Sequence, residues 1–192
     1  MQRLRTFIAV EVSSDVIGRA QKLIQQLTPL DDNVRWADPR AFHLTLSFLG
    51  DVELLELPKI CQAMRTAVGE LPPFDVVVHG AGAFPSVDRP RTIWLGIREG
   101  RDELRAMQSR LQDELSKLGF RGEARQFQPH LTIGKVKGHG DQCDPRFLDE
   151  LATLSDYPGG ATDVNEIVLF SSTQTRYGPS YEPLGDAPLL GE

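Results

Sequence analysis

Apolar residues along the chain recur either at alternate positions or with helical spacing, which predicts strands and amphipathic helices in turn. Thr6–Val12 is short and rich in β-formers, so we expect a strand there. Ser14 is a suitable cap for a helix that follows. The apolar face of this helix consists of Val16, Ile17, Ala20, Leu23, Ile24 and Leu27. Two further strands are predicted at Val34–Trp36 and Phe42–Leu49, the second ending at Gly50.

The same order of elements then returns. A helix over residues 57–68 and a strand at Phe74–Val78 precede a new strand at Thr92–Ile97. The next helix ends at Gly119, and its apolar face consists of Leu104, Met107, Leu111, Leu115 and Leu118. Phe127–Val136 follows as another strand.

The last part of the chain completes the predicted sheets. Asp144 caps a short helix with Pro145 at its first position. We expect strands near Val164–Ser171 and Tyr181–Leu184. Residues 185–192 have little to pack, so we expect a frayed tail.

One tripeptide, His-Leu-Thr, occurs at matched places in the two parts. Thr6 precedes His43 by 37 residues, and Thr92 precedes His130 by 38. The sequence therefore predicts an internal duplication, with half-repeats at about residues 1–88 and 89–184 of one domain spanning 1–184.

Composition narrows the possible functions. The 192 residues are 40% hydrophobic and 25% charged, which fits one globular domain. The net charge of −6 argues against capture of long nucleic acids but permits binding of a small phosphorylated end. Cys61 and Cys143 have no metal-ligand spacing, which favours a reducing cytoplasm. We expect no signal peptide, no membrane span and a monomer.

The candidate chemistry lies in the repeated tripeptide. On a strand, His43 and Thr45 point to one face, and His130 and Thr132 do the same on theirs. If a pseudo-two-fold axis relates the halves, two imidazoles and two hydroxyls face one cleft. Opening a cyclic phosphodiester needs a base for water and an acid for the leaving oxygen, and histidine serves as either near neutral pH. The hydroxyls can donate to phosphate oxygens.

A histidine on a strand is more often structural than catalytic when it stands alone. Here two of the four histidines begin the same tripeptide at matched positions, which core packing does not require. His79 and His139 lack the tripeptide and are interpreted as structural or surface residues.

The paired motifs, His43-Leu44-Thr45-Leu46 and His130-Leu131-Thr132-Ile133, resemble those of the 2H phosphoesterases. Other segments are similar to the RNA 2′,3′-cyclic phosphodiesterase branch, formerly called 2′-5′ RNA ligase. These segments are Arg5–Val10, Arg35-Trp36, Ala83-Phe84-Pro85, Pro90-Arg91 and Trp94-Leu95-Gly96. The resemblance covers about residues 4–184.

This resemblance implies a bilobed α+β fold, with two antiparallel sheets lining a central cleft and helices outside. It implies no cofactor, no metal, and an RNA or oligonucleotide end with a 2′,3′-cyclic phosphate as substrate. It makes His43 the proton donor and His130 the proton acceptor, a direction that the sequence alone leaves open.

The resemblance also suggests residues around the phosphate and the base. The family commonly has Arg where this chain has Lys135, which keeps the charge but loses the guanidinium fork. Strict alternation places Lys135 on the face opposite to that of His130, so a phosphate contact requires a bulge or a strand end there. A solvated lysine is the other interpretation. Phe7 and Phe48 are candidate base-stacking surfaces, with core packing as the alternative. Residues that could extend the electrostatic path for RNA are Arg35, Arg91, Arg125, Lys137 and Arg176.

Three alternatives remain. A metal hydrolase is disfavoured because catalytic zinc usually takes three protein ligands. An RNA-binding module without turnover would be better served by Arg or Lys than by two histidines. Ligation of a cyclic phosphate to a 5′-hydroxyl is the reverse reaction, and a well-positioned RNA end could compete with water.

Overall fold

The computed structural model describes residues 2–122, 126–138, 143–176 and 178–192. Within these residues the chain forms nine strands and four α-helices, in a mixed α+β order. The strands are β1 (Arg3–Glu11), β2 (Val34–Trp36), β3 (His43–Glu53), β4 (Phe74–Phe84), β5 (Thr92–Glu99), β6 (His130–Val136), β7 (Pro158–Val164), β8 (Glu166–Thr175) and β9 (Gly178–Pro188). The helices are α1 (Ser14–Leu27), α2 (Leu57–Val68), α3 (Arg101–Lys117) and α4 (Pro145–Thr153). Arg125 and His139 lie outside the described residues.

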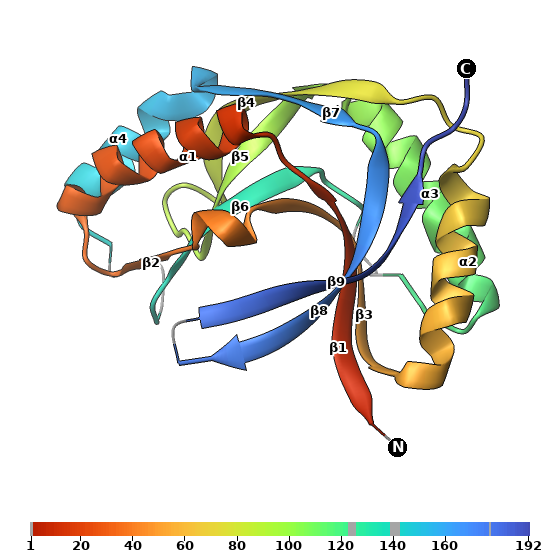
Figure 1. Ribbon diagram of the computed structural model, residues 1–192. Helices are drawn as coiled ribbons and strands as arrows, with labels where there is room; N and C mark the ends of the chain where they lie inside the picture. Colours follow the sequence, from red (N-terminus) through yellow and green to blue (C-terminus); the bar gives the residue numbers. More distant parts are fainter. Residues whose placement is uncertain (1, 123–125, 139–142, 177) are drawn as a thin grey trace.

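The strands form one curled antiparallel sheet in the order β7-β4-β5-β6-β3-β1-β8-β9, and β2 pairs with β6 (Figure 1). The two sheets expected from the sequence are thus joined, because β3 and β6 pair at Leu44 and Leu131. This junction divides the molecule into two lobes. The bilobed α+β architecture is confirmed, with the refinement that hydrogen bonding is continuous from one lobe to the other.

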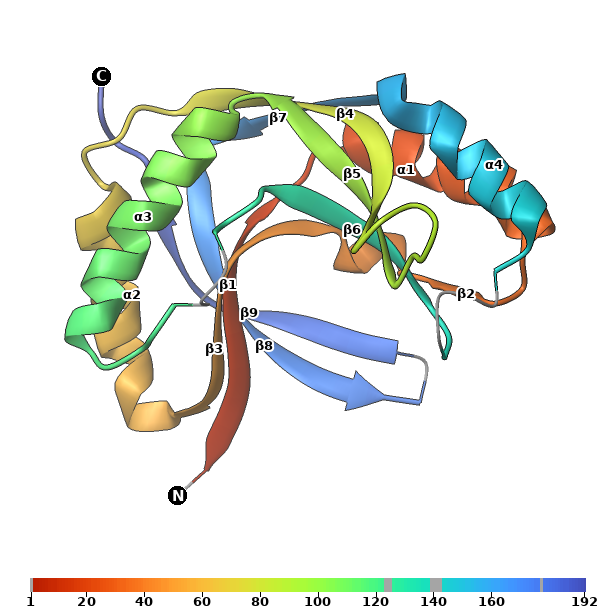
Figure 2. The ribbon, with the colours of Figure 1, turned by 180° about the vertical axis from the view of Figure 1, so that it is seen from behind.

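The helices cover the sheet in two pairs at opposite ends of the molecule (Figures 1 and 2). α1 lies against β7 and α4, whereas α2 lies against α3 and β9. Each pair combines one helix from residues 1–88 with one from 89–184, so the lobes do not coincide with the expected half-repeats. The strands mix in the same way, since β4 pairs with both β5 and β7. The duplication itself stays a prediction.

Local sequence explains where the helices begin. The hydroxyl of Ser13, one residue before the expected cap, accepts a hydrogen bond from the Val16 amide at 3.2 Å. Asp144 caps α4 as expected, accepting from the Arg146 amide at 2.9 Å, and Pro145 is its first residue.

The main core lies between the sheet and the helices, and it includes apolar residues from every α-helix. A second, smaller cluster lies on the other face of the sheet and consists of Phe7, Ala9, Val168 and Phe170, with Tyr181 beside it. The sheet is therefore apolar on both faces where β1 and β8 meet.

The expectation of a frayed tail is wrong. β9 continues to Pro188, which pairs with Glu166 at the start of β8. Ala187 is fully buried, and Leu189, 4% exposed, donates its amide to the Asn165 carbonyl at 2.8 Å. The β8–β9 pairing extends to Pro188 and supplies contacts for this segment. Local sequence did not reveal these contacts, because the paired residues are not close together in the sequence. Within the described residues, no helix is both long enough and apolar enough to span a bilayer.

Candidate active site

The two His-x-Thr motifs meet where the lobes join. Leu44 and Leu131 are cross-strand partners, and both are buried in the main core. Paired residues of antiparallel strands point to the same face, and their neighbours point to the other. His43, Thr45, His130 and Thr132 therefore share the face away from the core. The single β3–β6 bridge lies at the central leucine of both motifs.

Both imidazoles are held by the same backbone contact. The Nδ1 atom of His43 lies 2.7 Å from the Ala41 carbonyl, and the Nδ1 atom of His130 lies 2.7 Å from the Gln128 carbonyl. A carbonyl oxygen only accepts, so each Nδ1 carries hydrogen and donates. In the neutral ring, Nε2 is then the atom that can accept a proton. Each Nε2 is free to act as base when neutral and as acid when protonated.

Aromatic rings surround His43. Its ring centroid lies 4.7 Å from that of Phe7, and 5.3 Å from that of Tyr181, which meets it edge-on. Burial lowers the pKa of His43 below its ordinary value, the Ala41 carbonyl opposes this shift, and the charge of His130 adds to it.

His130 has its own aromatic support in the other lobe. Phe84 contacts it edge-on at a centroid distance of 5.0 Å, and Trp94 contacts Phe84 at 5.1 Å. Sequence reasoning assigned no role at the site to Phe84 or Tyr181. Phe84 lies in one of the segments that carried the family resemblance. No sequence pattern indicated Tyr181, which is on β9 and lies beside His43 because of the β8–β9 hairpin.

A bulge turns Lys135 to the histidine face. β5 pairs Ile93 with Gly134 but Trp94 with Thr132, so Ile133 is the extra residue. Ile133 is buried in the core, and a Cβ on Gly134 would lie 2.7 Å from the Trp36 ring on the same side. Because Ile133 and Gly134 both face the core, the side chain of Lys135 points to the same face as His130. The bulge that a contact with the phosphate requires is therefore present, and the Lys135 side chain is exposed. The contact itself stays a prediction.

The two candidate stacking residues differ in exposure. Phe48 and Phe7 are cross-strand partners, with ring centroids 6.1 Å apart. Phe48 is 61% exposed, whereas Phe7 is 3% exposed among Phe170, Tyr181 and His43. The stacking role is therefore wrong for Phe7, because it has no free ring face to offer a base. Phe48 keeps the role as a prediction.

The basic candidates are scattered. Arg35 lies directly opposite Lys135 across β2 and β6. Arg91 is exposed just before β5, and Lys137 donates its Nζ to the Asp32 carbonyl at 2.8 Å. Arg176 lies between β8 and β9. Half-buried His79 is on β4, where it pairs with Pro158, so the structure does not bring it into the His-x-Thr pair.

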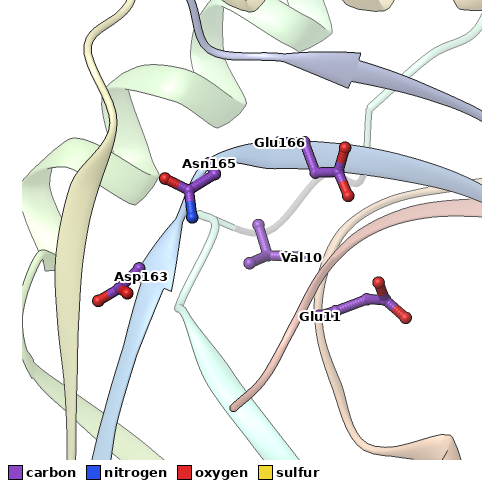
Figure 3. A pocket seen from close by; sticks show the side chains of 5 residues that line it. All are labelled: Val10, Glu11, Asp163, Asn165 and Glu166. Carbon is purple, nitrogen blue, oxygen red and sulfur yellow. The ribbon is translucent and has the colours of Figure 1, made fainter.

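A pocket elsewhere in the fold does not suit a phosphate. The pocket in Figure 3 is lined by Val10, Glu11, Asp163, Asn165 and Glu166. Its three carboxylates would repel an anion. Within the described part of the chain, no group of three or more His, Cys, Asp or Glu residues could hold a metal ion.

The fold and the paired motifs define a phosphoesterase-type site, and comparison with known proteins assigns the family. Residues 7–176 match the model of the 2′-5′ RNA ligase superfamily, and the chain belongs to this superfamily. It is 34% identical to the RNA 2′,3′-cyclic phosphodiesterase of Thermotoga maritima, over 98% of this chain and 97% of the relative. It is also 34% identical to that of Methanothermobacter thermautotrophicus, over 93% and 95%.

Solved structures share the fold. TT0787 of Thermus thermophilus superposes with a TM-score of 0.82 at 23% identity, covering 98% of this chain and 99% of that one. E. coli LigT complexed with 3′-AMP gives a TM-score of 0.77 at 22% identity, with the same coverage.

Proposed function

We propose that this protein is an RNA 2′,3′-cyclic phosphodiesterase that hydrolyses the cyclic end to a 2′-phosphomonoester. The observation that carries the proposal is the bridge between Leu44 and Leu131, which brings both His-x-Thr motifs to one face. The relatives named for this activity, which match nearly the whole chain, support it.

The chemistry follows from the Nε2 atoms. His130 Nε2 takes a proton from water, and the water oxygen attacks phosphorus. The bond from phosphorus to the 3′ oxygen breaks, and protonated His43 gives its Nε2 proton to that oxygen. The 2′ ester bond stays, so the product is a 2′-phosphate, and solvent restores both protonation states. Each proton transfer typically contributes about 10²- to 10⁴-fold in rate, so the pair can act without a metal.

The donor role of His43 depends on the substrate. Burial lowers the pKa of His43, which favours the neutral ring in the free protein. A bound phosphodiester is an anion, and an anion near an imidazole favours its protonated form. In this mechanism, substrate binding favours the protonated form of His43, which is the form that acts as the acid.

The remaining candidates bind the substrate. Thr45 and Thr132 donate hydrogen bonds to the non-bridging oxygens, where charge accumulates. Lys135 adds a positive charge on the same face, and Phe48 offers its exposed ring to the terminal base.

The free cysteines bear on the cellular setting. Cys61 and Cys143 are both free thiols, which supports a reducing cytoplasm. A monomer is sufficient for the mechanism, since both histidines come from one chain.

The direct test is to incubate the protein with a short RNA bearing a 2′,3′-cyclic end and to locate the product phosphate by ³¹P NMR. We expect a 2′-phosphomonoester from the wild type and no product from His43→Ala or His130→Ala. A 3′-phosphate, or turnover by either variant, contradicts the mechanism. Addition of an RNA with a 5′-hydroxyl end to the same reaction tests for ligation. A joined RNA product appears if the protein ligates the two ends.

A further inference from the structure

Two cations lie side by side at the far end of β6. Arg35 on β2 and Lys135 on β6 are direct cross-strand partners, and both side chains are exposed. Their neighbours Val34, Trp36 and Val136 pack against the core. Alternation therefore sends Arg35 and Lys135 together to the opposite face, which is the face of His130.

The pair is electrostatically unsatisfied. Within residues 2–122, 126–138, 143–176 and 178–192, neither Arg35 nor Lys135 has an ion-pair partner, although eight other ion pairs form. Like charges directly opposite each other destabilise a sheet. The protein as a whole is acidic, with a net charge of −6, so a local concentration of positive charge is not a general feature of its surface. An anion bound between the two side chains would remove the repulsion.

The position of the pair relates it to the candidate active site. Lys135 lies five residues beyond His130 on the same strand, which is roughly 16 Å at about 3.3 Å per residue, less a small shortening at the bulge. Lys135 is also the β5 partner of Thr92, which pairs with Phe84, the residue whose ring contacts His130. A continuous surface of β6, β5 and β4 therefore connects the histidine to the cation pair.

We propose that Arg35 and Lys135 bind a backbone phosphate of the RNA upstream of its reacting end, which makes an oligonucleotide a better substrate than a cyclic mononucleotide. The cyclic phosphate occupies the 3′ end, so the rest of the RNA necessarily extends from the histidines in the 5′ direction. The cation pair marks β6 and β2 as its path. This inference rests on the proposed function, because it assigns the substrate of the same site.

The test compares two substrates and two charge reversals. One substrate is a cyclic mononucleotide, and the other is a short single-stranded RNA with the same terminal nucleotide and a 2′,3′-cyclic end. Arg35→Glu is compared with Arg110→Glu, which makes the same charge change on exposed α3, away from β2 (Figure 1). We expect Arg35→Glu to lower the ratio of kcat/KM for RNA over mononucleotide by about tenfold or more, as loss of a phosphate contact weakens binding without sequence preference. Arg110→Glu should leave the ratio unchanged.

Salt dependence gives a second readout. Each phosphate neutralised on a single strand contributes a slope of about −0.7 to the dependence of log affinity on log salt. Arg35→Glu should therefore make the slope for RNA shallower by about that amount. A ratio and slope that match those of the wild type overturn the proposal, as does an equal fall in Arg110→Glu.

Failure of this inference can be told from failure of the proposed function. If the wild type turns over neither substrate, the hydrolytic function fails, and binding of a fluorescent 3′-phosphorylated RNA still tests the cation pair by anisotropy. Weaker binding by Arg35→Glu than by Arg110→Glu then supports the pair, and equal binding refutes it. Circular dichroism spectra that match the wild type exclude misfolding as the cause.

Discussion

Replacing each histidine by asparagine separates its chemical role from its structural one. An asparagine amide can still donate to the Ala41 carbonyl at position 43, or to the Gln128 carbonyl at position 130, where the imidazole Nδ1 atoms now lie 2.7 Å away. It has no atom equivalent to Nε2 that could carry a proton in catalysis. His43→Asn and His130→Asn should thus keep the local hydrogen bond and lose the reaction.

The expected loss of folding stability is smaller than the expected loss of catalysis. The preserved hydrogen bond is worth about 0.5–1.5 kcal/mol, and the lost aromatic contacts of His43 with Phe7 and Tyr181 are worth a similar amount. We therefore expect the free energy of unfolding to fall by about 1–2 kcal/mol for His43→Asn, and by less for His130→Asn, which loses only the contact with Phe84. Removing a proton-transfer group costs about 10²- to 10⁴-fold in rate, or about 2.7–5.4 kcal/mol of barrier.

The assay pairs single-turnover hydrolysis of a cyclic-ended RNA with urea unfolding of the same variants. Because the two imidazoles act in one transition state, the double variant should be little slower than either single one. If either single variant keeps more than about a tenth of the wild-type rate while stability is preserved, Nε2 is not a catalytic atom and the mechanism is refuted.

Burial lowers the pKa of His43 in the folded protein below 6.5, so the unfolded chain protonates His43 more readily than the folded protein does. The contribution of neutral His43 to stability is therefore complete above about pH 6.5. It is lost as the pH falls through the pKa of His43 in the folded protein. Urea titrations of wild type and His43→Asn from about pH 5 to pH 8 should diverge at the acid end, and parallel curves would contradict the shift. Phe48→Ala should raise KM by about 5- to 150-fold, from about 1–3 kcal/mol of lost stacking, with little change in melting temperature, since Phe48 is 61% exposed. Phe7→Ala, at 3% exposure, should instead lower the free energy of unfolding by about 3–5 kcal/mol, so calorimetry distinguishes the two. EDTA should leave the hydrolysis rate unchanged, and a loss of activity that zinc restores would support the metal alternative.

The order of elements and the identity of the central residues could be read from the sequence. Apolar periodicity depends on neighbours a few positions apart, so the strand of His43 and the helical face from Leu104 to Leu118 were predicted before any tertiary contact was known. The repeated His-Leu-Thr indicated which side chains share a face, because alternation on a strand is a local property.

Contacts between distant segments were decided only by the tertiary structure. The bridge at Leu44 and Leu131 joined the lobes into one sheet, and pairing with β8 ordered the segment that resembled a frayed tail. Tyr181 contacts His43 across 138 residues of chain, which no periodicity reports. A strand pattern states that one face is buried, but it does not identify the partner strand, since register depends on the whole sheet.

Lys135, beside the bulge in β6, illustrates the difference between what the sequence predicted and what the tertiary structure decided. The sequence posed the condition that Lys135 needs an irregular strand to reach the histidine face, and it could not tell whether the condition was met. Pairing of Ile93 and Trp94 on β5 with Gly134 and Thr132 supplies the extra residue. Local chemistry therefore named the candidate residues of the site, while cross-strand pairing brought His130, Thr132 and Lys135 to one face. The reason is that side-chain direction is set locally and proximity is not.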